Sequence, residues 1–417
     1  MAFRMPNGIA DSRPLGLLLV GSSRIDTYQY EQDMHHLTPN ALATNTARLS
    51  HLFGNSPDLL PLWIAEPYVE LDPRLKSCLT ERAAVGWYGY EARPADLLEA
   101  FWSWMERRHG WAGSQLQASV SPSIGTSIGV LLENFTRPGD GVILQPPVFT
   151  DFKPLVVAAD RSVVRSPLLL TQAGYEMDLD DLATQAAEPT TTAMILCNPH
   201  NPVGRLWNEN TLTEIAAICG DNDVLVIADE IHSDLVLPGH TFAPFAVTAT
   251  GTDVKWAALH GPIKTFGLAG VCDTLLITDN QDVHERFRRQ SSRLHLTRNN
   301  VFALAAFETV YRHGDVWLDE LLRLVATNVE LLAGNLPDPI SIIRPEATYL
   351  AWLDMRGLEL VVPELARWLA EAGLALSPGH WFGRDGAGFA RMTIATPSSV
   401  IEDAIGRLTA ALAQREA

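Results

Sequence analysis

The chain has 417 residues, of which 47% are hydrophobic, and its formal net charge is −18. This composition predicts a soluble globular protein that is long enough for two domains. The acidic balance argues against an extended nucleic-acid surface, because phosphates would be repelled, although a single local pocket can still attract a small anion.

The N-terminal region, residues 1–58, shows no clear secondary-structure pattern, and we expect it to form an arm that contributes to a small domain. Its apolar run at residues 15–20 is shorter than the core of a signal peptide or a membrane span, which predicts a cytoplasmic protein without a membrane partner. Cys78, Cys197, Cys219 and Cys272 are far apart and lack metal-type spacing, so a metal site is not expected. All but Cys78 lie in apolar stretches, which predicts buried reduced thiols.

Short apolar runs alternate with helical patterns through residues 59–300. The runs GVILQPP, AMILCNP, VLVIADE and DTLLITD have strand length and are bounded by turn residues. Continuous apolarity is typical of strands that are covered on both faces, as in a parallel sheet. We therefore expect a large α/β domain here, with its ligand site beyond the carboxyl ends of the strands.

Residues 301–417 have a different texture. Helical periodicity extends over about forty residues after 300, and TYLAWLDM and FARMTIAT then read as strands. This pattern predicts a second, smaller C-terminal α+β domain.

Three polar residues stand at places where chemistry is expected. Asp229 ends an apolar strand, although a lone Asp there is equally well explained as a helix N-cap. Asn201 lies in CNPHNPVGR, whose two Asn-Pro pairs exceed what a plain turn needs. Lys264 lies in HGPIKTFGLAG among small and apolar residues, where desolvation favours a nucleophilic amine over an ordinary surface lysine.

Asn201, Asp229 and Lys264, in this order and with these neighbours, resemble the signature of fold-type I pyridoxal 5'-phosphate (PLP) enzymes, the aspartate aminotransferase superfamily. The segments NPHNPVGRLW, DEIHSDLVLPGH and LSPGHWFGRDGAGFARMTIATP are similar to the MalY/PatB branch of cystathionine β-lyase-like C–S lyases. The resemblance covers about residues 60–417. It implies an α/β fold with a mostly parallel seven-stranded sheet and a smaller C-terminal domain.

The resemblance also implies roles around the cofactor ring. Lys264 would hold PLP as a Schiff base and then move the α-proton of the substrate. Asp229 would pair with the pyridine nitrogen, while Asn201 and His232 would serve the phenolic oxygen of the ring. Phe149 would stack on the ring face. Glu230 has no assigned role and is expected to be a solvated or structural acid.

Further residues are implied for the phosphate and for the substrate. The turn of Ile124, Gly125 and Thr126 would hold the phosphate at a helix N-terminus. Tyr90 would reach the phosphate from a neighbouring subunit, which implies a homodimer with shared active sites. Arg391 and the backbone of Ala65 would bind the α-carboxylate of an amino-acid substrate.

The chain departs from the family pattern near the expected site. Glu66 and Pro67 replace Asp-Met, and Gly261-Pro262-Ile263 replaces Ser-Pro-Ser before the lysine. Cys272 stands where many aminotransferases have a phosphate-binding arginine. Phe149 and Thr150 stand where lyases have tyrosines, so no phenol is available there to help a thiolate leave.

Three functions follow from these observations. The first is a PLP-dependent C–S β-lyase that converts cystathionine or a cysteine S-conjugate to thiol, pyruvate and ammonia, in specialised metabolism. The second is an aminotransferase or a decarboxylation-coupled oxidative deaminase, which the lost phenols and the altered lysine loop favour. The third is a regulator or partner-binding protein, against which the intact lysine, aspartate and arginine argue.

Overall fold

The computed structural model describes residues 40–56, 58–94 and 96–416. The apolar run at 15–20 and most of the predicted arm lie outside these residues. The described part of the arm contains a helix that the sequence did not reveal, α1 (Thr46–Phe53), in which Asn45 accepts a hydrogen bond from the amide of Arg48. Within the described residues, no helix combines the length and apolarity that crossing a membrane requires.

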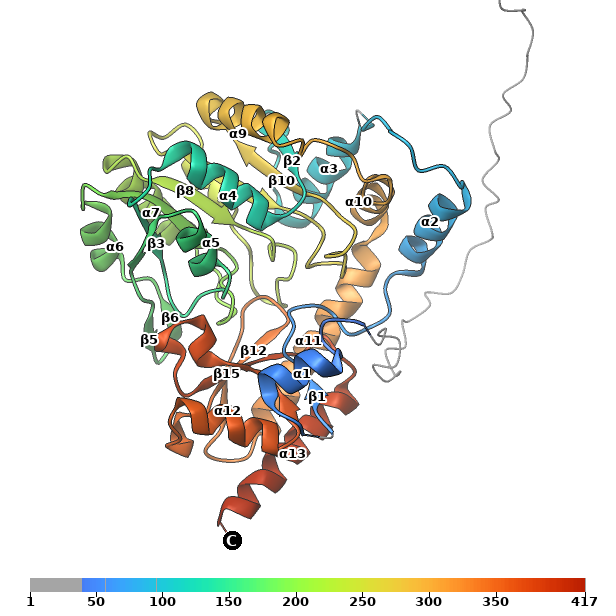
Figure 1. The fold of residues 1–417 in the computed structure, drawn as a ribbon, viewed down its shortest axis with the longest axis vertical. Helices are drawn as coiled ribbons and strands as arrows, with labels where there is room; N and C mark the ends of the chain where they lie inside the picture. Colours follow the sequence, from blue (N-terminus) through green and yellow to red (C-terminus); the bar gives the residue numbers. More distant parts are fainter. Residues whose placement is uncertain (1–39, 57, 95, 417) are drawn as a thin grey trace, which may run out of the picture.

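A seven-stranded sheet forms the larger part of the molecule (Figure 1). Its strands, in spatial order, are β2 (Gln117–Ser121), β10 (Thr274–Thr278), β9 (Trp256–His260), β8 (Leu225–Asp229), β7 (Thr191–Cys197), β3 (Gly141–Leu144) and β4 (Ser162–Arg165). The predicted mostly parallel sheet is confirmed, with β10 as its antiparallel member. Apolarity alone does not give strand direction, so DTLLITD could not be distinguished from its parallel neighbours.

Helices cover both faces of this sheet, which explains the continuous apolar strands. Val142 and Ile227 pack on one face, whereas Ile143 and Val226 pack on the other, as the two-residue period of a strand requires. Contacts with the strands place α4 (Ile124–Phe135), α5 (Phe152–Ala158) and α9 (Gln281–Arg293) on the first face. The second face carries α6 (Leu179–Ala186), α7 (Glu209–Asp221) and α8 (Phe245–Ala249).

Three further helices and one hairpin complete this part of the chain. α3 (Leu97–His109) and α2 (Pro73–Ala84) both contact α10 (Val301–His313), and the hairpin joins β5 (Leu169–Thr171) to β6 (Gly174–Glu176). The domain boundary that the sequence predicts near residue 300 therefore falls just before a helix that packs on earlier elements. That boundary stays a prediction.

A second, antiparallel sheet is built from the C-terminal region. Its order is β11 (Ser341–Ile343), β12 (Leu350–Asp354), β15 (Phe389–Thr393) and β14 (Ser377–Pro378). The associated helices are α11 (Asp315–Asn335), α12 (Val362–Glu371) and α13 (Ser398–Glu416), with short 3-10 turns η2 (Arg356–Leu358), η3 (Gly379–Phe382) and η4 (Arg384–Gly386). β1 (Leu60–Pro61) pairs with β13 (Leu374–Ala375), so the N-terminal segment also runs along this region.

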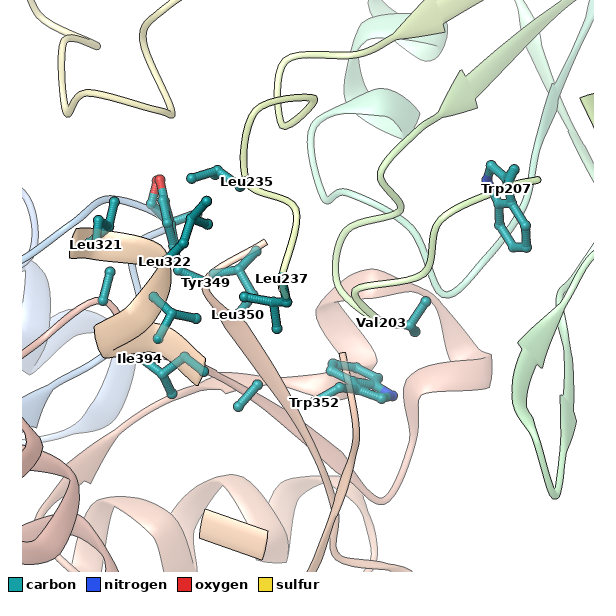
Figure 2. Packing of buried hydrophobic residues seen from close by; sticks show 14 of the residues in the cluster. Val203, Trp207, Leu235, Leu237, Leu321, Leu322, Tyr349, Leu350, Trp352 and Ile394 are labelled. Atoms are coloured by element: carbon teal, nitrogen blue, oxygen red, sulfur yellow. The ribbon is translucent and has the colours of Figure 1, made fainter. Parts of the chain in front are cut away.

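The two sheets meet where the chain leaves the large sheet after β8. Leu237 donates a backbone hydrogen bond to Glu346 (3.0 Å), and Thr348 donates one to Leu235 (2.6 Å). Figure 2 shows Leu235 and Leu237 beside Tyr349 and Leu350 at the start of β12. The carboxyl end of β8 is thereby held against the second sheet.

Candidate functional site

The sheet topology brings the expected site residues to one edge. β2, β3, β7, β8 and β9 run in the same direction, so the segments that follow them leave the sheet at a common edge. These segments begin at residues 122, 145, 198, 230 and 261, and they contain the predicted phosphate turn, Phe149, Asn201, His232 and Lys264. Ligand sites of open α/β sheets lie at such an edge.

Asp229 is the last residue of β8 and is only 5% exposed. The amide of Ile231 donates to its Oδ1 at 3.2 Å, and no basic side chain of the described residues forms an ion pair with it. Burial raises the pKa of the Asp229 carboxyl to about 7, although the charges of Lys264 and His260 act in the opposite direction. The structure thus presents a buried acid whose ionised form lacks a cationic partner.

Lys264 lies in the turn that follows β9, and its Nζ donates to the carbonyl of Ala65 at 2.9 Å. Burial lowers the pKa of the Lys264 amine to about 8, and the charge of Arg391 lowers it further, against the charges of Glu66, Asp229 and Asp151. A substantial fraction of this amine is therefore unprotonated at slightly alkaline pH, as a nucleophilic or proton-accepting lysine requires.

Asp234 fixes the segment next to Lys264. Its buried carboxylate accepts from Thr265 Oγ1 at 2.9 Å and from Trp104 Nε1 at 2.7 Å, and His109 Nε2 lies 2.8 Å from Oδ1. Hydrogen bonds and the charge of His109 overcome the effect of burial and lower the pKa of Asp234. Asp234 therefore stays ionised and anchors the residue that follows the lysine.

Tyr349 holds the same loop from the side of the second sheet. Its hydroxyl lies 3.1 Å from the carbonyl of Lys264 and 3.2 Å from that of Ala65, within hydrogen-bonding distance of both. Burial raises the pKa of Tyr349 well above its ordinary value, so the hydroxyl keeps its proton and acts as a donor. The position of Lys264 is thus determined by residues from three distant parts of the sequence.

Arg391 lies in β15 and is buried without a carboxylate partner among the described residues. Its Nη1 donates to Asn201 Oδ1 at 3.0 Å, and its Nη2 donates to the carbonyl of Trp63 at 2.8 Å. The guanidinium also lies over the ring of Phe382, 4.9 Å from its centroid. Burial lowers the pKa of Arg391 to about 10, so a buried cation here favours an anionic ligand.

Asn201 and Ala65 keep the donors that their predicted roles need. Arg391 occupies the side-chain oxygen of Asn201, and the Nδ2 donor forms no hydrogen bond to the described residues. The carbonyl of Ala65 accepts from Lys264, whereas the Ala65 amide donates no hydrogen bond within this part of the chain.

His232 is buried in the same region. Burial and the charges of Lys264 and Arg391 lower its pKa well below the ordinary value, so the imidazole is neutral. Its Nδ1 is buried without a hydrogen-bond partner among the described residues. A neutral ring with a free nitrogen can serve a polar ligand atom.

The N-terminus of α4 has the structure of an anion site. Ser123 is the N-cap, and its Oγ accepts from the amide of Thr126 at 3.1 Å and lies 2.9 Å from Thr126 Oγ1. Ser127 Oγ is buried without a partner in the described structure. The helix begins at Ile124 and continues through Gly125, so the predicted turn lies on the first helical turn, where unpaired amides attract anions.

Phe149 packs against a neighbouring side chain, whereas Tyr90 is largely exposed. Phe149 is half-buried and packs edge-on against Phe152, with ring centroids 5.4 Å apart. Tyr90 is 85% exposed, and the guanidinium of Arg298 lies 5.6 Å from its ring centroid. A partner subunit has to supply any contact that brings Tyr90 to a phosphate, so the shared site stays a prediction.

Several residues near the site escaped the sequence analysis. The charge of Asp151 raises the pKa of both Lys264 and Arg391, although it forms no ion pair with either of them. Glu230 was expected to be either a solvated or a structural acid. It is a structural acid, because it is fully buried and accepts a hydrogen bond from the amide of Phe245 at 2.7 Å. Its second oxygen lies 2.9 Å from Nε2 of the equally buried His260. In the sequence, the only sign of these residues was that polar side chains stand at or shortly after the end of an apolar strand.

Comparison with known proteins gives a consistent result. A family model described as aminotransferase class I and II matches residues 81–408. Cystathionine beta-lyase PatB of Bacillus subtilis is 34% identical over 370 residues, which cover 88% of this chain and 95% of PatB. A PLP-bound putative aminotransferase from Clostridium difficile superimposes with a TM-score of 0.84 at 31% identity, covering 90% of this chain and 98% of that structure. A PLP-bound C–S lyase from Staphylococcus hominis superimposes with a TM-score of 0.85 at 27% identity, covering 92% and 98%.

Proposed function

The chain belongs to the aminotransferase class I and II family, and from this premise we propose that it is a PLP-dependent C–S β-lyase. It would cleave cystathionine or another cysteine S-conjugate, with one water, to a thiol, pyruvate and ammonia. The observation that carries the lyase assignment is the similarity to PatB along nearly the whole chain. A role in specialised metabolism is part of the same proposal.

The unpaired groups of the site fit PLP. The buried carboxylate of Asp229 needs a cation, which a protonated pyridine nitrogen provides, and the free donor of Asn201 suits the phenolic oxygen. Ser127 Oγ and the amides at the start of α4 suit the phosphate. When bound, PLP would supply an electron sink for the negative charge that develops at the substrate Cα.

The side chains of this protein would divide the remaining work. Lys264 would hold the cofactor, and its low pKa lets Nζ accept the α-proton near neutral pH. Arg391 would grip the substrate carboxylate through two N–H groups, assisted by the free amide of Ala65. This grip fixes which bond of the Cα stands perpendicular to the ring, and that bond is the one that breaks.

The leaving thiolate would take its proton from Lys264. Neither Phe149 nor Thr150 offers a phenol, and the hydroxyls of Tyr68 and Tyr349 already contact backbone carbonyls. Burial also raises the pKa of both tyrosines, so they are poor acids. Lys264 is then the remaining group that has accepted a proton and can return it to sulfur.

The lack of a second acid also supports a competing function. A transamination or a decarboxylation-coupled oxidative deamination leaves the sulfur substituent in place and needs no acid beside it. These reactions would use Lys264, Asp229 and Arg391 in the same way. Substrate orientation, which side chains other than these three residues control, decides between them.

A product assay tests the proposal. We expect the PLP-loaded protein to release thiol and pyruvate in equal amounts from cystathionine or S-methylcysteine. Conversion of the cofactor to its amine form without thiol would instead show transamination. Aldehyde with carbon dioxide would show the decarboxylative reaction, and either result would reject the lyase.

The homodimer is a further part of the proposal. Trp87 and Tyr88 are each 56% exposed next to Tyr90, and such neighbouring exposed aromatic side chains favour a contact surface for a second subunit. We expect mixed dimers of Tyr90→Ala and Lys264→Ala chains to recover activity, because one of their two sites is intact. Sedimentation as a monomer, or no recovery in mixed dimers, would contradict a shared site.

A further inference from the structure

A cavity of about 500 Å³ adjoins the site between α5, the end of β3 and the turns η3 and η4. Phe149, predicted to stack on the cofactor, and Phe382, which contacts Arg391, both belong to its wall. These two rings are the wall that the cavity shares with the site, and the distal arm of a substrate whose carboxylate is held by Arg391 would enter the cavity beside them. Leu144 and Val163 supply apolar wall for the methylene groups of such an arm.

The polar part of the cavity wall is cationic. Lys153 and Arg384 line it, and neither side chain forms an ion pair or hydrogen bond with the described residues. Arg165 also lines the cavity, but Asp385 neutralises it. Asp151, two residues before Lys153, is exposed and does not line the cavity; its carboxylate accepts a hydrogen bond from Thr150 and forms no ion pair with Lys153.

The charge of this cavity wall is opposite in sign to the net charge of the whole chain. The chain carries a net charge of −18 and has only 31 basic residues. Two cations without partners at one cavity in such a chain attract a local anion. A small neutral substituent such as a methyl group would contact neither cation and would leave most of the cavity empty.

We propose that this cavity is a specificity site for an anionic group, a carboxylate in the first instance, on the sulfur substituent of the cysteine S-conjugate. Lys153 and Arg384 bind that group, and the apolar wall takes the chain between it and sulfur. The inference rests on the proposed lyase function and makes thioethers with an acidic distal end its preferred substrates.

The kinetic test compares two substrates of nearly identical shape. S-(2-carboxyethyl)-cysteine carries the anion, and S-(2-carbamoylethyl)-cysteine replaces it with a neutral amide. We expect the PLP-loaded enzyme to prefer the acid about tenfold or more in kcat/KM. Lys153→Gln and Arg384→Gln should each lower this ratio about threefold to fivefold, as loss of one partly exposed charge contact does. Arg415→Gln, which removes one exposed charge in the last turn of α13, should leave the ratio unchanged.

A binding test separates this inference from the lyase reaction. 2-Aminoheptanedioate replaces the sulfur of the acid substrate with a methylene group, so it cannot be cleaved, and its 7-amide is the neutral control. Calorimetry should show about tenfold tighter binding of the diacid by the wild-type enzyme, and a lower ratio in both variants. If no S-conjugate is cleaved but this ratio persists, the lyase proposal fails and the anion site stands. Equal affinity for diacid and amide, or a ratio unchanged in both variants, overturns the anion site.

Discussion

Replacing Asp229 with asparagine is expected to stabilise the cofactor-free protein at alkaline pH. The wild-type carboxylate is buried without a cation, and its pKa of about 7 lies about three above the ordinary value of 3.8. Below pH 4 the acid is protonated in the folded and the unfolded chain, so it carries no penalty. As the pH rises from about 4 to about 7, the unfolded chain loses this proton first and the free energy of unfolding falls.

The size of this effect follows from the two pKa values. The folded and unfolded pKa values of Asp229 differ by about three, and each pKa unit corresponds to about 1.4 kcal/mol. The ionised carboxylate therefore lowers the free energy of unfolding by at most about 4 kcal/mol above pH 7. Asparagine keeps the oxygen that accepts from Ile231 but adds a buried amide donor without a partner, which costs about 1–3 kcal/mol. We therefore expect a net gain of about 2 kcal/mol at pH 8 and a net loss of about 1–3 kcal/mol at pH 4, where the wild-type acid carries no penalty.

Urea denaturation of the cofactor-free proteins at several pH values measures this difference. Asp223→Asn is the matched control, because Asp223 is exposed and its pairing with Lys255 contributes little. Added PLP should reverse the order, raising the stability of the wild type more than that of Asp229→Asn. A variant that is less stable than the wild type at pH 8 without cofactor would refute the reasoning.

Three further predictions concern the groups that hold the site. Lys264→Ala should lose the visible absorbance of covalently held cofactor, and retention of that absorbance without added amine would contradict the assignment. Arg391→Lys should keep the absorbance but raise the KM for S-conjugates about 100-fold, because an ammonium cannot form the bidentate contact to a carboxylate. An unchanged KM would exclude Arg391 from the carboxylate site. Asp234→Ala should lower the free energy of unfolding by about 3 kcal/mol in urea, because it leaves buried donors unpaired, and Thr265→Val should cost about 1 kcal/mol. Equal losses of unfolding free energy in the two variants would show that the hydrogen bond between Thr265 and Asp234 accounts for the whole stabilisation by Asp234.

The sequence predicted the elements that depend on local pattern. Continuous apolar runs gave β3, β7, β8 and β10, and their polar ends gave Asn201 and Asp229. β9 was missed, since its five residues end in a histidine and resemble no long apolar run. The family resemblance, rather than any local pattern, supplied the proposed role of Arg391.

Contacts between distant segments could not be predicted in the same way. Tyr349 and Asp234 look like ordinary polar members of a strand entry and a turn, yet their partners lie up to 284 residues away. The charge of Asp151 acts on Lys264 and Arg391 only because folding brings residues from distant parts of the chain together. Such roles depend on tertiary geometry, which residue type and spacing do not encode.

The hydrogen bond from Arg391 to the carbonyl of Trp63 joins residues 328 positions apart. During synthesis, the segment around Trp63 therefore emerges from the ribosome long before its partner exists. The strands of the large sheet lie within residues 117–278, whereas the proposed substrate grip cannot be complete until β15 has been translated. On the proposed role of Arg391, capture of substrate would be a property of the finished polypeptide, and fragments released early would lack it.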